Sequence, residues 1–128
     1  MNKKIKIIKN RSDLGAGTRG SDMGIDAIEI AAINKGSDYF SLYSFKDVDT
    51  INEAIYNKQK AKFALRIENV LKVCTNLAND VKDAISDDFF PIVISGDHSS
   101  ALGTISGIKM AHPNKRLGVV WIDAHADV

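Results

Sequence analysis

An open α/β sheet, mostly parallel and with helices on both faces, is the fold that this sequence predicts. Residues 91–95 and 117–122 are brief apolar runs, typical of strands that are buried on both faces of a parallel sheet. Stretches with helical spacing of apolar residues separate the strand-like runs. The predicted order is strand, helix, strand, helix, strand, helix, strand, which favours right-handed crossovers in one layered domain.

The amino-terminal third contains one predicted strand and one predicted helix. Residues 4–9 alternate lysine with isoleucine, and we interpret them as an edge strand whose charges prevent unwanted pairing. Residues 10–21 form a loop rich in Gly, Ser and Asp. Residues 22–35 have helical spacing, and Gly36 is well placed to end that helix in a left-handed conformation. The apolar positions of this helix are Ile25, Ile28, Ala32 and Ile33.

The middle of the chain contains a second strand and a long helix. Residues 39–45 are rich in aromatic side chains and predict a strand, whereas residues 46–57 are irregular or a short helix. Residues 58–86 lack Gly and Pro and predict a helix with an apolar stripe. The stripe consists of Phe63, Ile67, Val70, Leu71, Cys74, Leu77, Val81 and Ile85. We interpret Cys74 as a core residue, since nothing nearby in sequence would lower its pKa.

The carboxyl-terminal third contains two predicted strands, each followed by a polar loop. After the strand at residues 91–95, residues 96–99 form a tight turn and residues 100–111 a helix that ends at His112-Pro113. The strand at residues 117–122 leads directly into Asp123.

Composition excludes several classes of function. The 128 residues suit one domain, and 17 basic against 16 acidic residues leave a formal charge of +1. Such a small charge gives little electrostatic attraction for nucleic acid. No segment is long enough to span a bilayer, and the start lacks the apolar run of an export signal. Together with a single cysteine, these features lead us to expect a cytoplasmic protein with no membrane or nucleic-acid partner.

The residues with catalytic potential follow the last two predicted strands. In open parallel sheets, ligands bind beyond the carboxyl ends of the strands. Asp123, His125 and Asp127 alternate with alanines, so an extended backbone would direct all three side chains to one side. Carboxylates with an imidazole, and no cysteine, suit a divalent ion such as manganese better than a structural zinc. His98 follows the neighbouring strand, with Asp97 as its hydrogen-bonding partner or as a cap.

These two loops resemble the metal motifs of the arginase, or ureohydrolase, family. Gly96-Asp97-His98-Ser99 is similar to the first motif, and Asp123-Ala124-His125-Ala126-Asp127 to the second. The similarity extends through residues 90–128, and the sequence around Trp121 is most similar to that of arginases. Earlier segments match only loosely. The resemblance implies a three-layer αβα fold, of which residues 1–128 would be the amino-terminal portion, truncated after the second metal loop.

The resemblance also implies an activity and a set of roles. His98, Asp123 and Asp127 would bind one Mn²⁺, and Asp123 would bridge to a second ion that His125 also binds. His125, Asp127 and Val128 would border a small guanidino substrate. The implied reaction is hydrolysis of the guanidinium group, of L-arginine first of all, to an amine and urea, in a homo-oligomer of three or six subunits. Agmatinases and formimidoylglutamases share these ligands.

The sequence departs from the family pattern in two ways. Ser95 stands where the family usually has another glycine, which could alter the turn without removing a ligand. The further Asp-x-Asp ligands, the proton-shuttling histidine and the contacts to the α-amino acid are absent from residues 1–128. We therefore expect a piece of a longer enzyme that is inactive, or nearly so, by itself.

Two other interpretations remain open at this level. Residues 15–20 have the G-x-G-x-x-G spacing of a dinucleotide-binding turn, but residues 10–14 separate them from the predicted strand. We interpret them as a flexible loop that borders the active-site side. The second alternative is a non-catalytic regulatory or assembly module that retains the metal loop as a relic.

Overall fold

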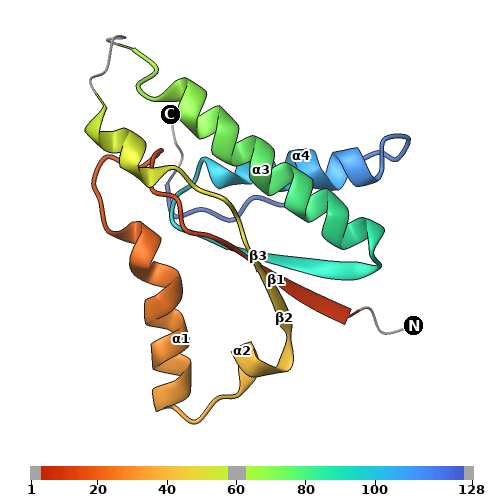
Figure 1. The fold of residues 1–128 in the computed structure, drawn as a ribbon. Coiled ribbons are helices and arrows are strands. Elements are labelled where there is room, and N and C mark those ends of the chain that lie inside the picture. Colours follow the sequence, from red (N-terminus) through yellow and green to blue (C-terminus); the bar gives the residue numbers. More distant parts are fainter. Residues whose placement is uncertain (1–3, 58–62, 126–128) are drawn as a thin grey trace.

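The fold is an open parallel sheet with helices packed against it, as the sequence predicted, and within the described residues the sheet has three strands where four were expected (Figure 1). The computed structural model describes residues 4–57 and 63–125. The strands are β1 (Lys4–Asn10), β2 (Ser44–Asp47) and β3 (Phe89–Ser95). The helices are α1 (Gly24–Asn34), α2 (Tyr39–Leu42), α3 (Ile67–Ser86) and α4 (Ser100–Ala111), with 3₁₀ turns η1 (Ser21–Met23) and η2 (Asn52–Tyr56).

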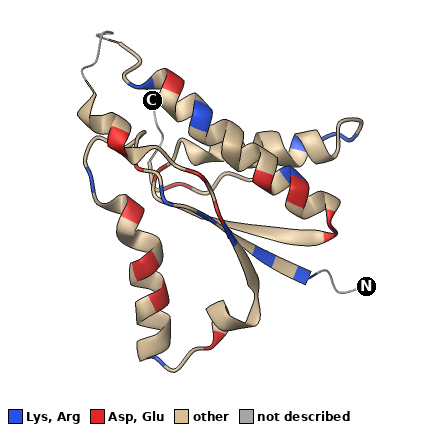
Figure 2. Ribbon diagram, viewed as in Figure 1, with Lys and Arg blue, Asp and Glu red and all other residues tan. Residues whose placement is uncertain are grey.

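Strand β1 lies in the middle of the sheet, so its assignment to an edge was wrong. The strand order is β2-β1-β3, and Ile7 is aligned with a residue on each neighbouring strand. Two of the β1 lysines, which are blue in Figure 2, have partners inside the fold. Lys6 Nζ lies 4.7 Å from the centre of the Phe89 ring. Lys9 is only 6% exposed, forms an ion pair with Glu29 of α1 and lies 4.0 Å from the centre of the Phe45 ring. Alternating lysines therefore do not mark an edge here, because aromatic rings contact Lys6 and Lys9 and helix α1 pairs with Lys9.

Helices lie on both faces of the sheet. Ile8 is fully buried and belongs to a core cluster with Leu77 and Val81 of α3. Lys9, the next residue, contacts Glu29 of α1. Because successive side chains of a strand point to opposite faces, α3 covers one face of β1 and α1 the other.

Helix α3 is shorter than predicted. It begins at Ile67, because Arg66 has a left-handed backbone with φ of 58° and interrupts the helical path. Residues 58–62, where the predicted helix began, lie outside the described residues. The stripe is confirmed at Cys74, Leu77 and Val81, which are buried. Three of its first four members are exposed, namely Phe63, Ile67 and Leu71, and Val70 is half-buried.

Helix α4 has the predicted bounds and packs closely on α3. A Cβ at Gly103 would lie 2.7 Å from the carbonyl oxygen of Cys74, and one at Gly107 would lie 2.5 Å from that of Ala78. The two glycines therefore allow the helix backbones to approach. Cys74 is confirmed as a core residue: burial raises the pKa of its thiol, which donates a hydrogen bond to the Ser99 carbonyl 3.3 Å away.

The first helix forms as predicted, but its apolar stripe is mostly uncovered. Gly36 ends it with φ of 70°, which confirms the left-handed terminus. Ile25 is buried, whereas Ile28 and Ile33 are exposed. Spacing therefore identified the helix correctly and did not identify which face packs. Of the helices in the described ranges, none has the length and apolar character needed to cross a membrane.

The second predicted strand begins five residues later than expected. Residues 39–42 form α2, since the carbonyl of Asp38 accepts hydrogen bonds from the amides of Ser41 and Leu42. The aromatic rings pack on one another within this turn: Tyr39 meets Phe40 edge-on at 5.3 Å between centroids. The aromatic content of residues 39–45 led to a wrong start for the strand, because these rings pack on one another locally. The strand itself is β2.

Residues 117–122 do not form the predicted fourth strand. Within the described chain they are assigned to no strand and pair with no neighbour. Val120 is 88% and Ile122 is 93% exposed, while Val119 and Trp121 face a cavity beside β3 and α4. An apolar run of this length forms a strand of a parallel sheet only where neighbouring strands offer hydrogen-bonding partners and other elements cover both of its faces.

The half-buried Asp80 carboxyl is expected to make the stability of the fold depend on pH. Burial raises the pKa of the Asp80 carboxyl, and Lys46, 3.8 Å away, offsets only part of that effect. Ionisation of Asp80 therefore lowers the free energy of unfolding as pH rises through the raised pKa. Below the ordinary pKa of aspartate the carboxyl is protonated, and this loss of stability is absent. We expect Asp80→Asn to unfold at higher urea than wild type at about pH 7 and at equal urea at about pH 3. The exposed Asp87→Asn serves as the control, and an equal gain at both pH values would contradict the assignment.

Candidate metal centre

The first candidate loop follows β3 and is held tightly by its neighbours. The Gly96 amide donates to the Asn10 carbonyl at 3.2 Å, which continues the β1–β3 ladder by one bond. A Cβ at Gly96 would collide with the Ser12 carbonyl, so this turn requires glycine. The Ser95 hydroxyl, at the position where the family usually has glycine, accepts a hydrogen bond from Asn10 Nδ2 at 3.1 Å and lies against the Ser100 hydroxyl. The departure at Ser95 therefore adds polar contacts under the turn.

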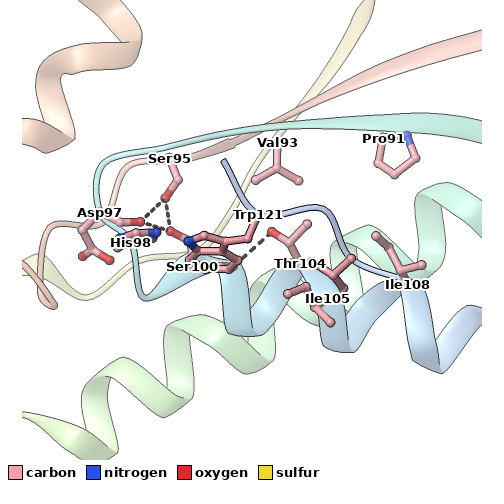
Figure 3. A pocket seen from close by; sticks show the side chains of 12 residues that line it. Pro91, Val93, Ser95, Asp97, His98, Ser100, Thr104, Ile105, Ile108 and Trp121 are labelled. Atoms are coloured by element: carbon pink, nitrogen blue, oxygen red, sulfur yellow. Dashed lines mark hydrogen bonds between the residues drawn. The ribbon is translucent and has the colours of Figure 1, made fainter. Parts of the chain in front are cut away.

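His98 and Asp123 come together from the two loops. His98 Nε2 lies 3.3 Å from Asp123 Oδ2. The Trp121 ring stacks on the His98 imidazole, with 4.8 Å between centroids and 18° between planes (Figure 3). The indole Nε1 of Trp121 also donates to Asp123 Oδ2 at 3.3 Å. One aromatic side chain thus orients both predicted ligands.

His125 is placed near Asp123 through the backbone. Its amide donates to Asp123 Oδ1 at 3.0 Å, and its Nδ1 lies 3.8 Å from the same oxygen. Residues 124 and 125 form a bend, so the segment does not have the extended path that would align alternate side chains. The amide of His125 first, then the Trp121 indole and the His98 imidazole, hold the pKa of Asp123 below its ordinary value.

The described residues include three of the four predicted ligands, namely His98, Asp123 and His125. Asp127 and Val128 lie outside the described residues. Among residues 4–57 and 63–125, no group of three or more His, Cys, Asp or Glu side chains is arranged to hold a metal ion. His98 Nε2 and His125 Nδ1 lie 3.3 Å and 3.8 Å from the Asp123 carboxylate, and ligation by the full set of four stays a prediction.

A cavity of about 410 Å³ opens beside this pair. Val93, Ile105 and Trp121 are among its apolar walls, and Asp97 and His98 are at its polar end (Figure 3). The role of Trp121 was missed by reasoning from residue patterns. Its position two residues before Asp123 was an available signal, because such neighbours share a side in extended chain.

The loop with the G-x-G-x-x-G spacing lies against the turn that carries His98. The Gly15 amide donates to Asp97 Oδ2 at 2.9 Å. Asp13 is fully buried, accepts a hydrogen bond from the Gly20 amide at 3.0 Å and pairs with Arg19 at 3.3 Å. The loop is thus held by its own carboxylate and by the turn that carries His98.

The fold and the site together define an open parallel α/β protein in which an imidazole and a carboxylate meet beyond the carboxyl end of β3. The chain belongs to the arginase family, whose model matches residues 3–128. The resemblance carried by the two motifs is therefore confirmed, and it extends to the earlier segments, in which no motif was similar.

Individual relatives agree with this assignment. The chain is 38% identical over 130 residues to the arginase of Bacillus subtilis, covering 100% of this chain and 42% of the relative. It is 33% identical over 128 residues to the arginase of Bacillus caldovelox, covering 98% of this chain and 42% of that one. The chain spans about two fifths of the length of these curated relatives.

Solved structures show the same partial correspondence. A crystal structure of Bacillus subtilis arginase matches with a TM-score of 0.70 and 36% identity, over 98% of this chain and 40% of that one. Entamoeba histolytica arginase, solved in complex with L-ornithine, matches with a TM-score of 0.78 and 27% identity, over 98% of this chain and 42% of that one. The three-stranded sheet is thus part of an arginase fold.

Proposed function

We propose that this chain supplies one part of a two-manganese centre that hydrolyses a guanidinium group, L-arginine giving L-ornithine and urea in the complete enzyme. The observation that carries the proposal is the 3.3 Å approach of His98 Nε2 to Asp123 Oδ2, from two loops far apart in the sequence. Residues 1–128 would be the amino-terminal portion of a single arginase-like domain. The length of the curated relatives supports this view.

The donor groups suit manganese, which the arginase family uses. Imidazole nitrogen and carboxylate oxygen without thiolate favour a divalent ion of this type over structural zinc. The Asp123 carboxylate is ionised at neutral pH, as a ligand must be, and its lowered pKa keeps it ionised in more acidic solution. When bound, the ions would supply Lewis acidity, which polarises the substrate and acidifies water.

Each residue of this chain would have a definite task. His98, Asp123, His125 and Asp127 would hold the metal, and Trp121 would keep the His98 ring turned toward Asp123. The carboxylates would attract a cationic guanidinium, and His125, Asp127 and Val128 would border it. We further propose a cytoplasmic homo-oligomer, trimer or hexamer, that acts on a small molecule and not on nucleic acid or membranes.

Reconstitution tests this function. The chain by itself is expected to release no urea from L-arginine. Mixed with Mn²⁺ and the remainder of Bacillus subtilis arginase beyond the matched region, it is expected to release urea. The exposed Asp87→Ala variant should behave as wild type in the same mixture.

The outcomes separate the competing functions. Release from agmatine, or breakdown of formimidoylglutamate, in place of arginine would reassign the substrate within the family. Demonstrated association of the two pieces without turnover of any of these substrates would contradict the enzymatic proposal and favour the relic module.

A further inference from the structure

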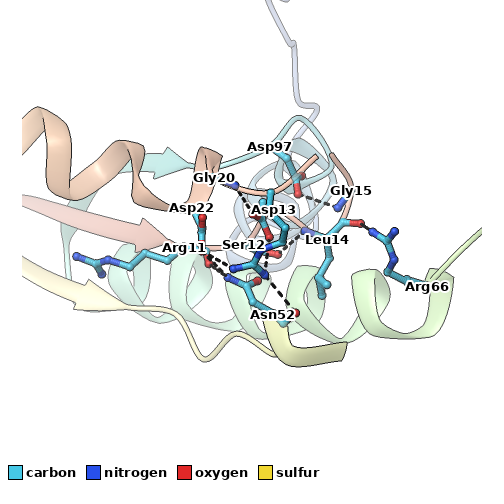
Figure 4. Close-up of polar contacts among 11 residues, drawn as sticks. Arg11, Ser12, Asp13, Leu14, Gly15, Gly20, Asp22, Asn52, Arg66 and Asp97 are labelled. Carbon is cyan, nitrogen blue, oxygen red and sulfur yellow. Dashed lines mark hydrogen bonds and ion pairs between the residues drawn. The ribbon is translucent and has the colours of Figure 1, made fainter. Parts of the chain in front are cut away.

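The peptide group between Leu14 and Gly15 is held at both of its ends by charged side chains. Arg66 Nη1 donates to the Leu14 carbonyl at 2.9 Å, and the Gly15 amide donates to Asp97 Oδ2 at 2.9 Å (Figure 4). A cation thus faces the carbonyl oxygen and an anion faces the amide hydrogen. Each charge polarises the peptide in the sense that strengthens the other hydrogen bond.

The same Asp97 carboxylate also holds the turn that carries His98. Its second oxygen, Oδ1, accepts the Ser99 amide at 2.9 Å and the Ser99 hydroxyl at 2.5 Å. Asp97 and Ser99 flank His98, so this contact closes a ring around the histidine backbone. The hydrogen bonds within this turn use only Oδ1. Oδ2 accepts the hydrogen bond from Gly15, a residue 82 positions away in the sequence.

The contact leaves no space for a side chain at Gly15. A Cβ there would lie 2.9 Å from both the Cβ and the Oγ of Ser99, and 3.0 Å from Asp97 Oδ1. By contrast, a Cβ at Gly17 would meet nothing within 4 Å. The first glycine of the G-x-G-x-x-G segment is thus required by its approach to the His98 turn, and the second has no such constraint.

We propose that Asp97 is a positioning residue, which uses the Leu14–Gly15 peptide as its anchor and thereby fixes the His98 imidazole where it meets Asp123. This inference rests on the proposed metal-dependent function. It assigns the glycine loop a task in holding a ligand, in place of binding a dinucleotide. Arg66, at the start of α3, is the far end of the same chain of contacts.

A double-mutant cycle on the 128-residue chain tests the link. Asp97→Asn presents an amide in place of one carboxylate oxygen, and Gly15→Ala pushes the loop away from Ser99. Each is expected to weaken Mn²⁺ affinity by about 10- to 100-fold, the usual effect of losing a residue that orients a ligand. The double variant is expected to lose no more than either single one, because both break the same contact. Asp87→Asn and Gly17→Ala are the matched controls and should bind as wild type.

A metal-free measurement keeps this inference separate from the proposed function. Trp121 is the only tryptophan of the chain and stacks on His98, so its emission reports the position of that ring. Asp97→Asn and Gly15→Ala are each expected to shift this emission and to speed hydrogen exchange at the residue 15 amide. If wild type binds no Mn²⁺, the proposed function fails, and the emission still decides the role of Asp97.

The inference is overturned if exchange at residue 15 rises while Trp121 emission and Mn²⁺ affinity match wild type. Asp97 would then only brace the loop. Should Asp97→Asn lose its circular dichroism signal for helix, Gly15→Ala and Arg66→Met provide the same comparison from the other side of the contact.

Discussion

Asp123→Asn is expected to reduce the affinity of the chain for Mn²⁺ by more than the roughly 100-fold that loss of a ligand's hydrogen-bonding partner causes. Asp123 is the residue on which His98, Trp121 and the His125 amide converge. The substitution preserves shape and removes the negative charge, so a large loss would reflect ligation and not disturbed packing. Titration followed by Trp121 emission and by calorimetry measures the affinity.

Reconstituted activity provides the second readout for Asp123. With the remainder of Bacillus subtilis arginase present, urea release is expected to fall to background in Asp123→Asn and to persist in the exposed Asp87→Asn. Affinity and urea release close to wild type in Asp123→Asn would mean that Asp123 is no ligand, and the metal centre proposed for this chain would have to be abandoned.

Leu77→Ala is expected to lower the free energy of unfolding by about 2–5 kcal/mol. Leu77 is fully buried where α3 packs on β1, in a cluster with Ile8, Val48 and Val81. Truncation removes apolar contact and leaves a cavity, because α4 already packs at Gly103 so closely on α3 that even a Cβ there would clash with the Cys74 carbonyl, and the helix cannot easily move inward. Urea denaturation followed by circular dichroism gives the free energy.

The matched control for this core prediction is Leu71→Ala on the same helix. Leu71 is 58% exposed, so its truncation is expected to change the free energy of unfolding by less than about 0.5 kcal/mol. Equal losses at the two positions would show that burial of α3 against the sheet does not determine the stability of this chain.

Residue patterns predicted some contacts of the candidate site and not others. The rule that loops after parallel strands share one edge predicted that His98 and Asp123 come together, and they do so although residues 117–122 form no strand in the described structure. The stacking of Trp121 on His98 does not follow from that rule, because it depends on the path those residues take beside α4. The constraint on Gly15 was also inaccessible, since the clash involves Ser99 and Asp97 from another loop.

The sequence by itself determined the local elements of this protein. Helical spacing and the His112-Pro113 stop predicted α4 to the residue, and the conformational freedom of glycine predicted the left-handed Gly36. Alternation of lysine with isoleucine located β1, and an apolar run located β3. These features depend on dihedral preferences and on side-chain periodicity, which a few neighbouring residues specify.

Only the tertiary structure decided which elements are neighbours. It placed the lysine-rich β1 in the centre of the sheet, began α3 at Ile67 and left residues 117–122 outside any ladder. The physical reason is that strand order and burial are set by contacts between distant segments. A lysine is stable inside once Glu29 and the Phe45 ring meet it, and no pattern within β1 records that they will.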